Sequence, residues 1–110
     1  KSRVVGVMQD GFYLKFNGIS LKGLKHLKFA SFYNLDQEFK GAVEIHEDGI
    51  DGPIIGKQVL AHNGVEETFY YNIPVSPTKD NANLYLVFTN KENPTQNICH
   101  ADWISFDYKR

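Results

Sequence analysis

Hydrophobic and polar residues alternate along most of the chain, which is the pattern of strands with one buried face. In residues 24–33, LKHLKFASFY, alternation would place Leu27, Phe29 and Tyr33 on one face and Lys28 and Ala30 on the other. Similar segments recur with Gly, Asn, Asp and Pro between them, and the expected strands are 3–8, 12–21, 24–33, 41–47, 54–60, 68–73, 84–88 and 102–108. About eight short strands without a helical period predict an all-β fold, an antiparallel sandwich or barrel.

The end of the chain, residues 83–108, carries the clearest pair of expected strands. Leu84, Leu86 and Phe88 alternate with Tyr85 and Val87, a polar loop follows, and residues 102–108 alternate again. We expect these two strands to adjoin. The second begins with Asp102 beside Trp103, and an Asp at such a position is more often a turn-former or strand cap than a ligand.

The loops between the expected strands fall into two groups. If each strand reverses the one before it, alternate loops gather at the same end of the sandwich. Residues 7–11, 33–40, 61–67 and 89–100 would meet at one end, and the connections 17–23, 48–53 and 74–83 at the other. Because binding residues are concentrated on loops held by a rigid scaffold, we expect a site at the first end.

Length and charge narrow the function classes. The 110 residues fit one domain, 1–110, and the formal net charge of -1 lacks the basic excess of a nucleic-acid binder. The longest apolar run, 84–88, is far shorter than the ~20 residues that span a bilayer, so a membrane is not an expected partner. Cys99 is the single cysteine and cannot form an internal disulfide. The abrupt N-terminus leads us to expect a piece of a longer polypeptide.

The motifs of catalysis are not evident. The four histidines match no zinc-ligand spacing, and adjacent strand residues point to opposite faces. A glycosidase needs two carboxylates ~5 to 10 Å apart across a cleft, whereas Glu66 and Glu67 are neighbours on one loop. With no nucleophile elbow or phosphate loop, we do not expect an enzyme.

Several landmarks occur in a known order. They are GFYLKF (11–16), LKGL (21–24), AVEI (42–45), GPIIG (52–56), Asn63-Gly64, NLYLVF (83–88) and ADWISF (101–106). This order resembles the family 6 carbohydrate-binding modules over most of residues 6–108. The resemblance implies a jelly-roll β-sandwich that is not itself an enzyme. It also implies that the sandwich belongs to a secreted or otherwise extracytoplasmic multidomain protein, and that its partners are a polysaccharide or glycan and the other domains of the parent chain.

The resemblance also implies where a sugar would bind. Family members grip sugars in a loop-lined cleft at one end, and some use a second site on a sheet face. The positions of the family's two cleft aromatics and its Asn correspond here to Val7, Glu66 and His100. Because sugars pack on aromatic rings while polar groups hold their hydroxyls, other residues must supply the contacts. We expect these from the loop end, with Phe39 as a further ring, or from Tyr70, Tyr71 or Tyr85 on a sheet face; the loop-end candidates are Tyr33, Asn34, Glu66, Asn97 and His100.

A structural calcium is the cofactor that the resemblance brings into question. Relatives hold it with the Asp of the Asp-Trp pair, here Asp102, and with a Glu on an N-terminal strand that has no counterpart in this sequence. Calcium needs six to eight oxygen ligands, so we expect no cofactor and a hydrogen-bonding role for Asp102. Two functions stay open at this point: a module that tethers a larger protein to a polysaccharide, and a sandwich that has lost sugar binding and serves as a spacer or docking module between domains.

Overall fold

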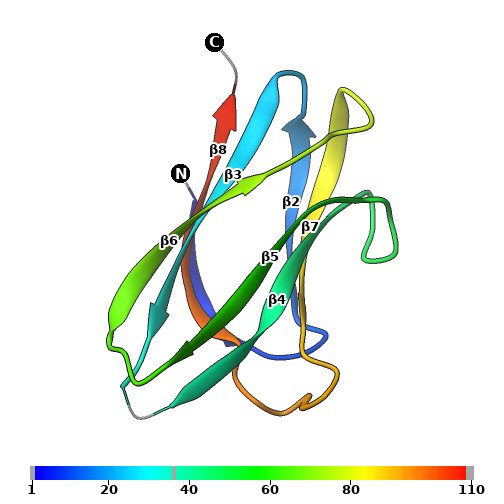
Figure 1. Cartoon of the computed structure of the whole chain (residues 1–110). Coiled ribbons are helices and arrows are strands. Elements are labelled where there is room, and N and C mark those ends of the chain that lie inside the picture. Colours follow the sequence, from blue (N-terminus) through cyan, green and yellow to red (C-terminus); the bar gives the residue numbers. More distant parts are fainter. Residues whose placement is uncertain (1, 36, 109–110) are drawn as a thin grey trace.

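The structure, a computed structural model, describes residues 2–35 and 37–108 and consists of strands joined by loops (Figure 1). The eight strands are β1 (Ser2–Met8), β2 (Tyr13–Ser20), β3 (Leu24–Tyr33), β4 (Glu38–Glu47), β5 (Ile54–Asn63), β6 (Glu67–Pro74), β7 (Asn81–Thr89) and β8 (Cys99–Tyr108). Each matches an expected segment, and the differences lie at the ends, where hydrogen bonding extends β4, β5, β7 and β8 by two or more residues.

The strands form two four-stranded antiparallel sheets packed face to face. One sheet has the order β1-β8-β3-β6 and the other β2-β7-β4-β5. Most steps along the chain therefore cross from one sheet to the other, as in a jelly roll, and the predicted all-β antiparallel sandwich is confirmed. Over the described residues, no helix is long and apolar enough to cross a membrane.

The expectation that the last two strands adjoin is wrong. β7 lies between β2 and β4, whereas β8 lies between β1 and β3 in the opposite sheet. A period-two pattern shows which face of a strand is buried but not which sheet contains it. The connection over residues 90–98 is longer than the two to five residues of a typical hairpin, and it crosses the ~10 Å between the sheets.

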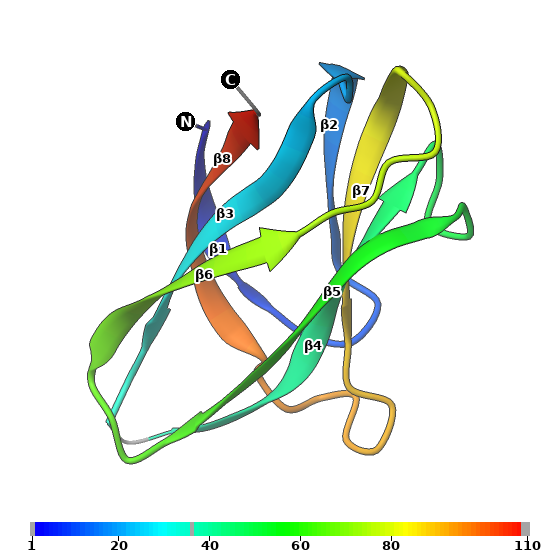
Figure 2. The same ribbon diagram turned by 45° about the horizontal axis from the view of Figure 1, so that its top comes forward.

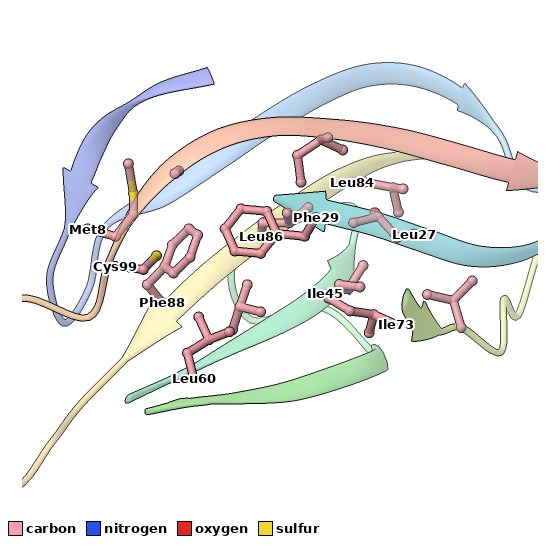
Figure 3. Close-up of a cluster of buried hydrophobic side chains, with 14 of the residues drawn as sticks. Met8, Leu27, Phe29, Ile45, Leu60, Ile73, Leu84, Leu86, Phe88 and Cys99 are labelled. Carbon is pink, nitrogen blue, oxygen red and sulfur yellow. The ribbon is translucent and has the colours of Figure 1, made fainter. Parts of the chain in front are cut away.

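The core lies between the inner faces of the two sheets (Figure 3). Leu27, Phe29 and Tyr33 of β3 point inward and are fully buried, as their alternation predicts. From the opposite sheet Leu86 and Phe88 meet them, and the rings of Phe29 and Phe88 lie 6.0 Å apart. This packing makes β3 a rigid central strand, so side chains on its outer face have fixed positions.

Four loops meet at one end of the sandwich, shown at the bottom of Figures 1 and 2. They follow β1, β3, β5 and β7, which is the group that strand reversal predicts. Hydrogen bonds tie them together: Asn90 N–H donates to Asp10 Oδ1 at 2.8 Å, and Gln96 Nε2 donates to the Glu38 carbonyl at 3.1 Å. This surface is called the loop end below.

Candidate functional site

At the loop end, Asn34 and His100 come together from different strands. Asn34 follows β3, His100 lies near the start of β8, and Asn34 Nδ2 is 3.3 Å from His100 Nε2. The imidazole packs edge-on against Phe39 and Phe32, with ring centroids 5.4 and 6.4 Å away. Both polar side chains are half-buried, so they present fixed hydrogen-bonding groups to a ligand.

Asn97, another predicted site residue, belongs to a second polar group at the same end. Its Oδ1 accepts a hydrogen bond from Gln9 Nε2 at 3.0 Å, and its Nδ2 donates to Gln37 Oε1 at 3.1 Å. These contacts join the loops after β1, β3 and β7. Since both ends of the Asn97 amide already have protein partners, its main contribution here is to hold the loops in position.

Glu66 and Tyr33 also lie at the loop end, but they differ in access. Glu66 is exposed in the turn before β6, and its neighbour Glu67 pairs with Tyr33. Tyr33 is 0% exposed, with Phe39, Phe69 and His62 around its ring. Tyr33 therefore offers no ring face to a sugar, because its whole side chain points inward and is buried in the core. The same holds for Phe39, which is 1% exposed.

An aromatic pair with one exposed ring, Tyr70, and one half-buried ring, Trp103, lies instead on the outer face of the β1-β8-β3-β6 sheet. In the strand register Ala30 of β3 is flanked by Tyr70 of β6 and Trp103 of β8. The two large side chains lean over the small one: their ring centroids are 5.9 Å apart, inclined at 43°, and Ala30 is 0% exposed beneath them. Tyr70 keeps 70% of its surface exposed, so its ring can accept a flat ligand.

A shallow hollow of about 400 Å³ adjoins this pair. It lies over three successive β3–β6 register pairs, and Phe29 and Tyr71 of the middle pair turn toward the core. The register pair Lys28–Asn72, whose side chains point to the outer face, adds an ammonium and an amide to the rim of the hollow. Aromatic rings with a few convergent polar groups are the usual composition of a sugar site.

The hollow and the loop end share β3. Phe32, the register partner of His100, is two residues from Ala30 and lies on the same face, a separation of about 7 Å along a strand. The aromatic pair over Ala30 therefore lies about two residues along β3 from the position where Asn34 and His100 meet. The sequence predicts Tyr70 and Tyr71 as candidate sheet-face residues, but it does not single out Trp103, Lys28 or Asn72. For Trp103 a signal was present: its neighbour Ile104 is buried, so alternation along the strand turns Trp103 outward.

Tyr71 faces the core and anchors β6. Its hydroxyl lies 2.8 Å from the Tyr33 hydroxyl and 2.8 Å from Nε2 of His62 on β5. Burial raises the pKa of both tyrosines and lowers the pKa of His62, whose ring stacks on Phe69 at 3.9 Å. This chain of polar groups fixes the edge strand that carries Tyr70.

Tyr85, the remaining sheet-face candidate, lies on the outer face of the other sheet. Its ring is 5.7 Å from the exposed ring of Tyr13, and Lys15 Nζ lies 5.5 Å from the Tyr85 centroid. The lysine and Tyr13 lie against Tyr85, which is only half-exposed. This face is therefore a weaker aromatic platform than the Tyr70–Trp103 pair.

Asp102 lies half-buried at the irregular point of the β3–β8 register, between Ala101 and Trp103. Among the residues whose side chains the structure describes, 6–35 and 37–108, no group of three or more His, Cys, Asp or Glu could hold a metal ion. The expected absence of a cofactor stays a prediction.

A jelly-roll sandwich hosts many functions, so its loop end and its aromatic sheet face are candidate surfaces and the fold alone does not define a role. The family model described as carbohydrate binding module (family 6) matches residues 1–108. The chain belongs to this family of non-catalytic carbohydrate-binding modules, in agreement with the resemblance found in its sequence. No curated protein matches it.

Solved structures show the same fold. A glycoside hydrolase family 43 arabinoxylan arabinofuranohydrolase from Bacillus subtilis, in complex with cellotetraose, matches with a TM-score of 0.75 and 19% identity over 94% of this chain, which spans 20% of that enzyme. A family 6 carbohydrate-binding module from Clostridium cellulolyticum in complex with xylose matches at 0.70 and 21%, over 91% of this chain and 74% of the other. A module from Clostridium stercorarium in complex with cellobiose matches at 0.64 and 14%, over 93% and 71%.

Proposed function

We propose that this module tethers a larger, extracytoplasmic protein to a polysaccharide, and that it grips the glycan with Tyr70 and Trp103 on the outer face of the β1-β8-β3-β6 sheet. One observation carries the proposal: Tyr70 is 70% exposed and its ring lies 5.9 Å from that of Trp103 over a buried Ala30. An exposed ring braced by a second ring supplies the flat apolar surface on which sugars pack.

The polar contacts come from both directions along β3. Asn72 lines the hollow on one side of the aromatic pair, and Asn34 and His100 lie on the other side, toward the loop end. A glycan of several sugar units can therefore run across the pair from Asn72 to His100. Such binding is weak for each sugar, and its value is effective concentration, because a linked domain stays near its polymer. The alternative of a spacer without sugar binding is not favoured, since the family is one of carbohydrate-binding modules.

Binding can be tested without a label because Trp103 is the only tryptophan. Oligosaccharides of xylan, cellulose and other plant and algal glycans are titrated while tryptophan fluorescence is recorded, and pull-down on the insoluble polymers gives the retained fraction. Tyr70→Ala is expected to weaken binding at least tenfold, a loss of about 1.4 kcal/mol.

Tyr13→Ala is the matched control, because it removes an exposed tyrosine from the other sheet. It is expected to bind like the parent chain, and both variants are expected to keep the parent's melting temperature to within a few degrees. Loss of binding in Tyr13→Ala with retention in Tyr70→Ala would place the site on the opposite face. Uniform failure of the parent chain across the glycans would reject the proposed function.

A further inference from the structure

The hollow beside the aromatic pair carries a positive charge at a defined position. Lys28 lies on the same face of β3 as Ala30, two residues away, and lines the hollow together with Tyr70 and Trp103. Its register neighbours are Asn72 on β6 and Ser105 on β8, which are both uncharged. The ammonium group is therefore flanked by groups that can share a ligand with it but cannot neutralise it.

Three of the eight lysines that the structure describes have acidic partners. Lys79 Nζ lies 2.6 Å from Asp48, Lys40 lies 3.7 Å from Glu92, and Lys57 lies 3.7 Å from Glu44. Among the described residues, Lys28 takes part in no ion pair of this kind.

The acids nearest along the sheet are differently placed. Asp107, on β8 beyond Ser105, lies 3.8 Å from His26 Nδ1, and Asp102 precedes Trp103 at the irregular point in the register. Glu67, the acidic residue of β6, is the register partner of Tyr33 at the loop end. The middle of the face, where the hollow lies, thus keeps the charge of Lys28 without a carboxylate opposite it.

We infer that the glycan held by this module is anionic, and that Lys28 binds a carboxylate or sulfate group of the sugar unit next to the one stacked on Tyr70. This inference rests on the proposed function, because it names the class of glycan for the same site. A charge-assisted hydrogen bond is roughly twice as strong as a neutral one, so the ammonium that lines the hollow favours an anionic group on the ligand. Asn72 is placed to donate to a second oxygen of the same group.

The test compares matched glycans. Oligogalacturonate and its methyl ester differ by the carboxylate charge, and a sulfated galactan oligosaccharide and its desulfated form differ by the sulfate. One of the charged members is expected to bind about tenfold more tightly than its neutral partner, and the preference is expected to shrink as salt is raised toward 1 M. Which pair shows the preference distinguishes the carboxylate from the sulfate.

Lys28→Gln is expected to abolish the preference, so that the charged and the neutral partner bind it with equal affinity. Lys22→Gln is the control, because it removes the same charge from an exposed position at the end away from the loop end. Equal affinity for charged and neutral partners, with binding still dependent on Tyr70, would overturn the inference and leave the proposed function standing. A preference unchanged in Lys28→Gln, or lost equally in Lys22→Gln, would also overturn it. Failure of every glycan to bind would reject the proposed function itself.

Discussion

The hydroxyl groups of Tyr33 and Tyr71 offer a quantitative test of how β6 is held. The two oxygens are 2.8 Å apart, and the Tyr71 hydroxyl also contacts His62 Nε2 at 2.8 Å. Tyr33 is 0% exposed, whereas Tyr71 is half-buried. Replacing each tyrosine by Phe removes one oxygen and leaves the ring, so the two variants differ in the hydrogen bonds they remove and in the groups they leave behind.

Tyr71→Phe is expected to cost more, although its side chain is the more exposed. It removes two hydrogen bonds and leaves the buried Tyr33 hydroxyl with Ser31 as its remaining hydrogen-bond partner, for a total of about 2 to 3 kcal/mol. Tyr33→Phe removes one hydrogen bond and leaves the Tyr71 hydroxyl paired with His62, for about 1 kcal/mol. In the double variant no buried hydroxyl is left unpaired, so it is expected to be little less stable than Tyr71→Phe alone.

Urea unfolding at pH 7.5 measures these free energies, and each kcal/mol corresponds to roughly 4 °C in melting temperature for a domain of this size. A loss in Tyr33→Phe equal to or larger than that in Tyr71→Phe would refute the reasoning. So would strict additivity in the double variant, since it would show that the two hydroxyl groups do not interact.

Four further expectations follow from buried or paired groups. Burial lowers the pKa of His62 in the folded state, so the stability it contributes should be full above its ordinary pKa of about 6.5 and should fall as the pH drops below that value. Urea unfolding at a series of pH values should show this slope, and His62→Gln should reduce it. Burial raises the pKa of Cys99 to about 12, so a thiol reagent at pH 8 should label it only after unfolding. Glu47 is 0% exposed and accepts hydrogen bonds from the backbone and hydroxyl of Thr78, so Glu47→Ala should cost about 3 kcal/mol in urea unfolding, and a cost below ~1 kcal/mol would contradict these contacts. EGTA should leave the melting temperature unchanged, and a fall would show that Asp102 holds calcium after all.

The fold could be predicted from the sequence because each strand buries one face. Alternation in residues 24–33 correctly identifies Leu27, Phe29 and Tyr33 as inward-facing, and it does so without any knowledge of the neighbouring strands. The same pattern could not assign β7 and β8 to opposite sheets, because pairing partners depend on loop length and twist rather than on periodicity.

The candidate site was harder to predict for the same physical reason. Burial of Tyr33 follows from the inward face already assigned to it, but the pairing of Tyr70 and Trp103 depends on register, since residues 33 positions apart in sequence meet only because both flank Ala30. Asn34 and His100 come together at the loop end as strand reversal indicates. The sequence thus predicts residues that share a loop cluster better than residues that share a sheet face.

The pairing of the first strand with the last has a consequence for how the chain acquires its structure. β1 pairs with β8, and β8 separates β1 from β3. The hydrogen bonding of this sheet therefore does not reach from β1 to β3 until the final strand is in place. In the described chain, β4 and β5 are the consecutive strands that pair with each other within one sheet. Folding that must wait for such distant partners is slow, and an unfinished chain emerging from the ribosome exposes strand edges to aggregation in the interval.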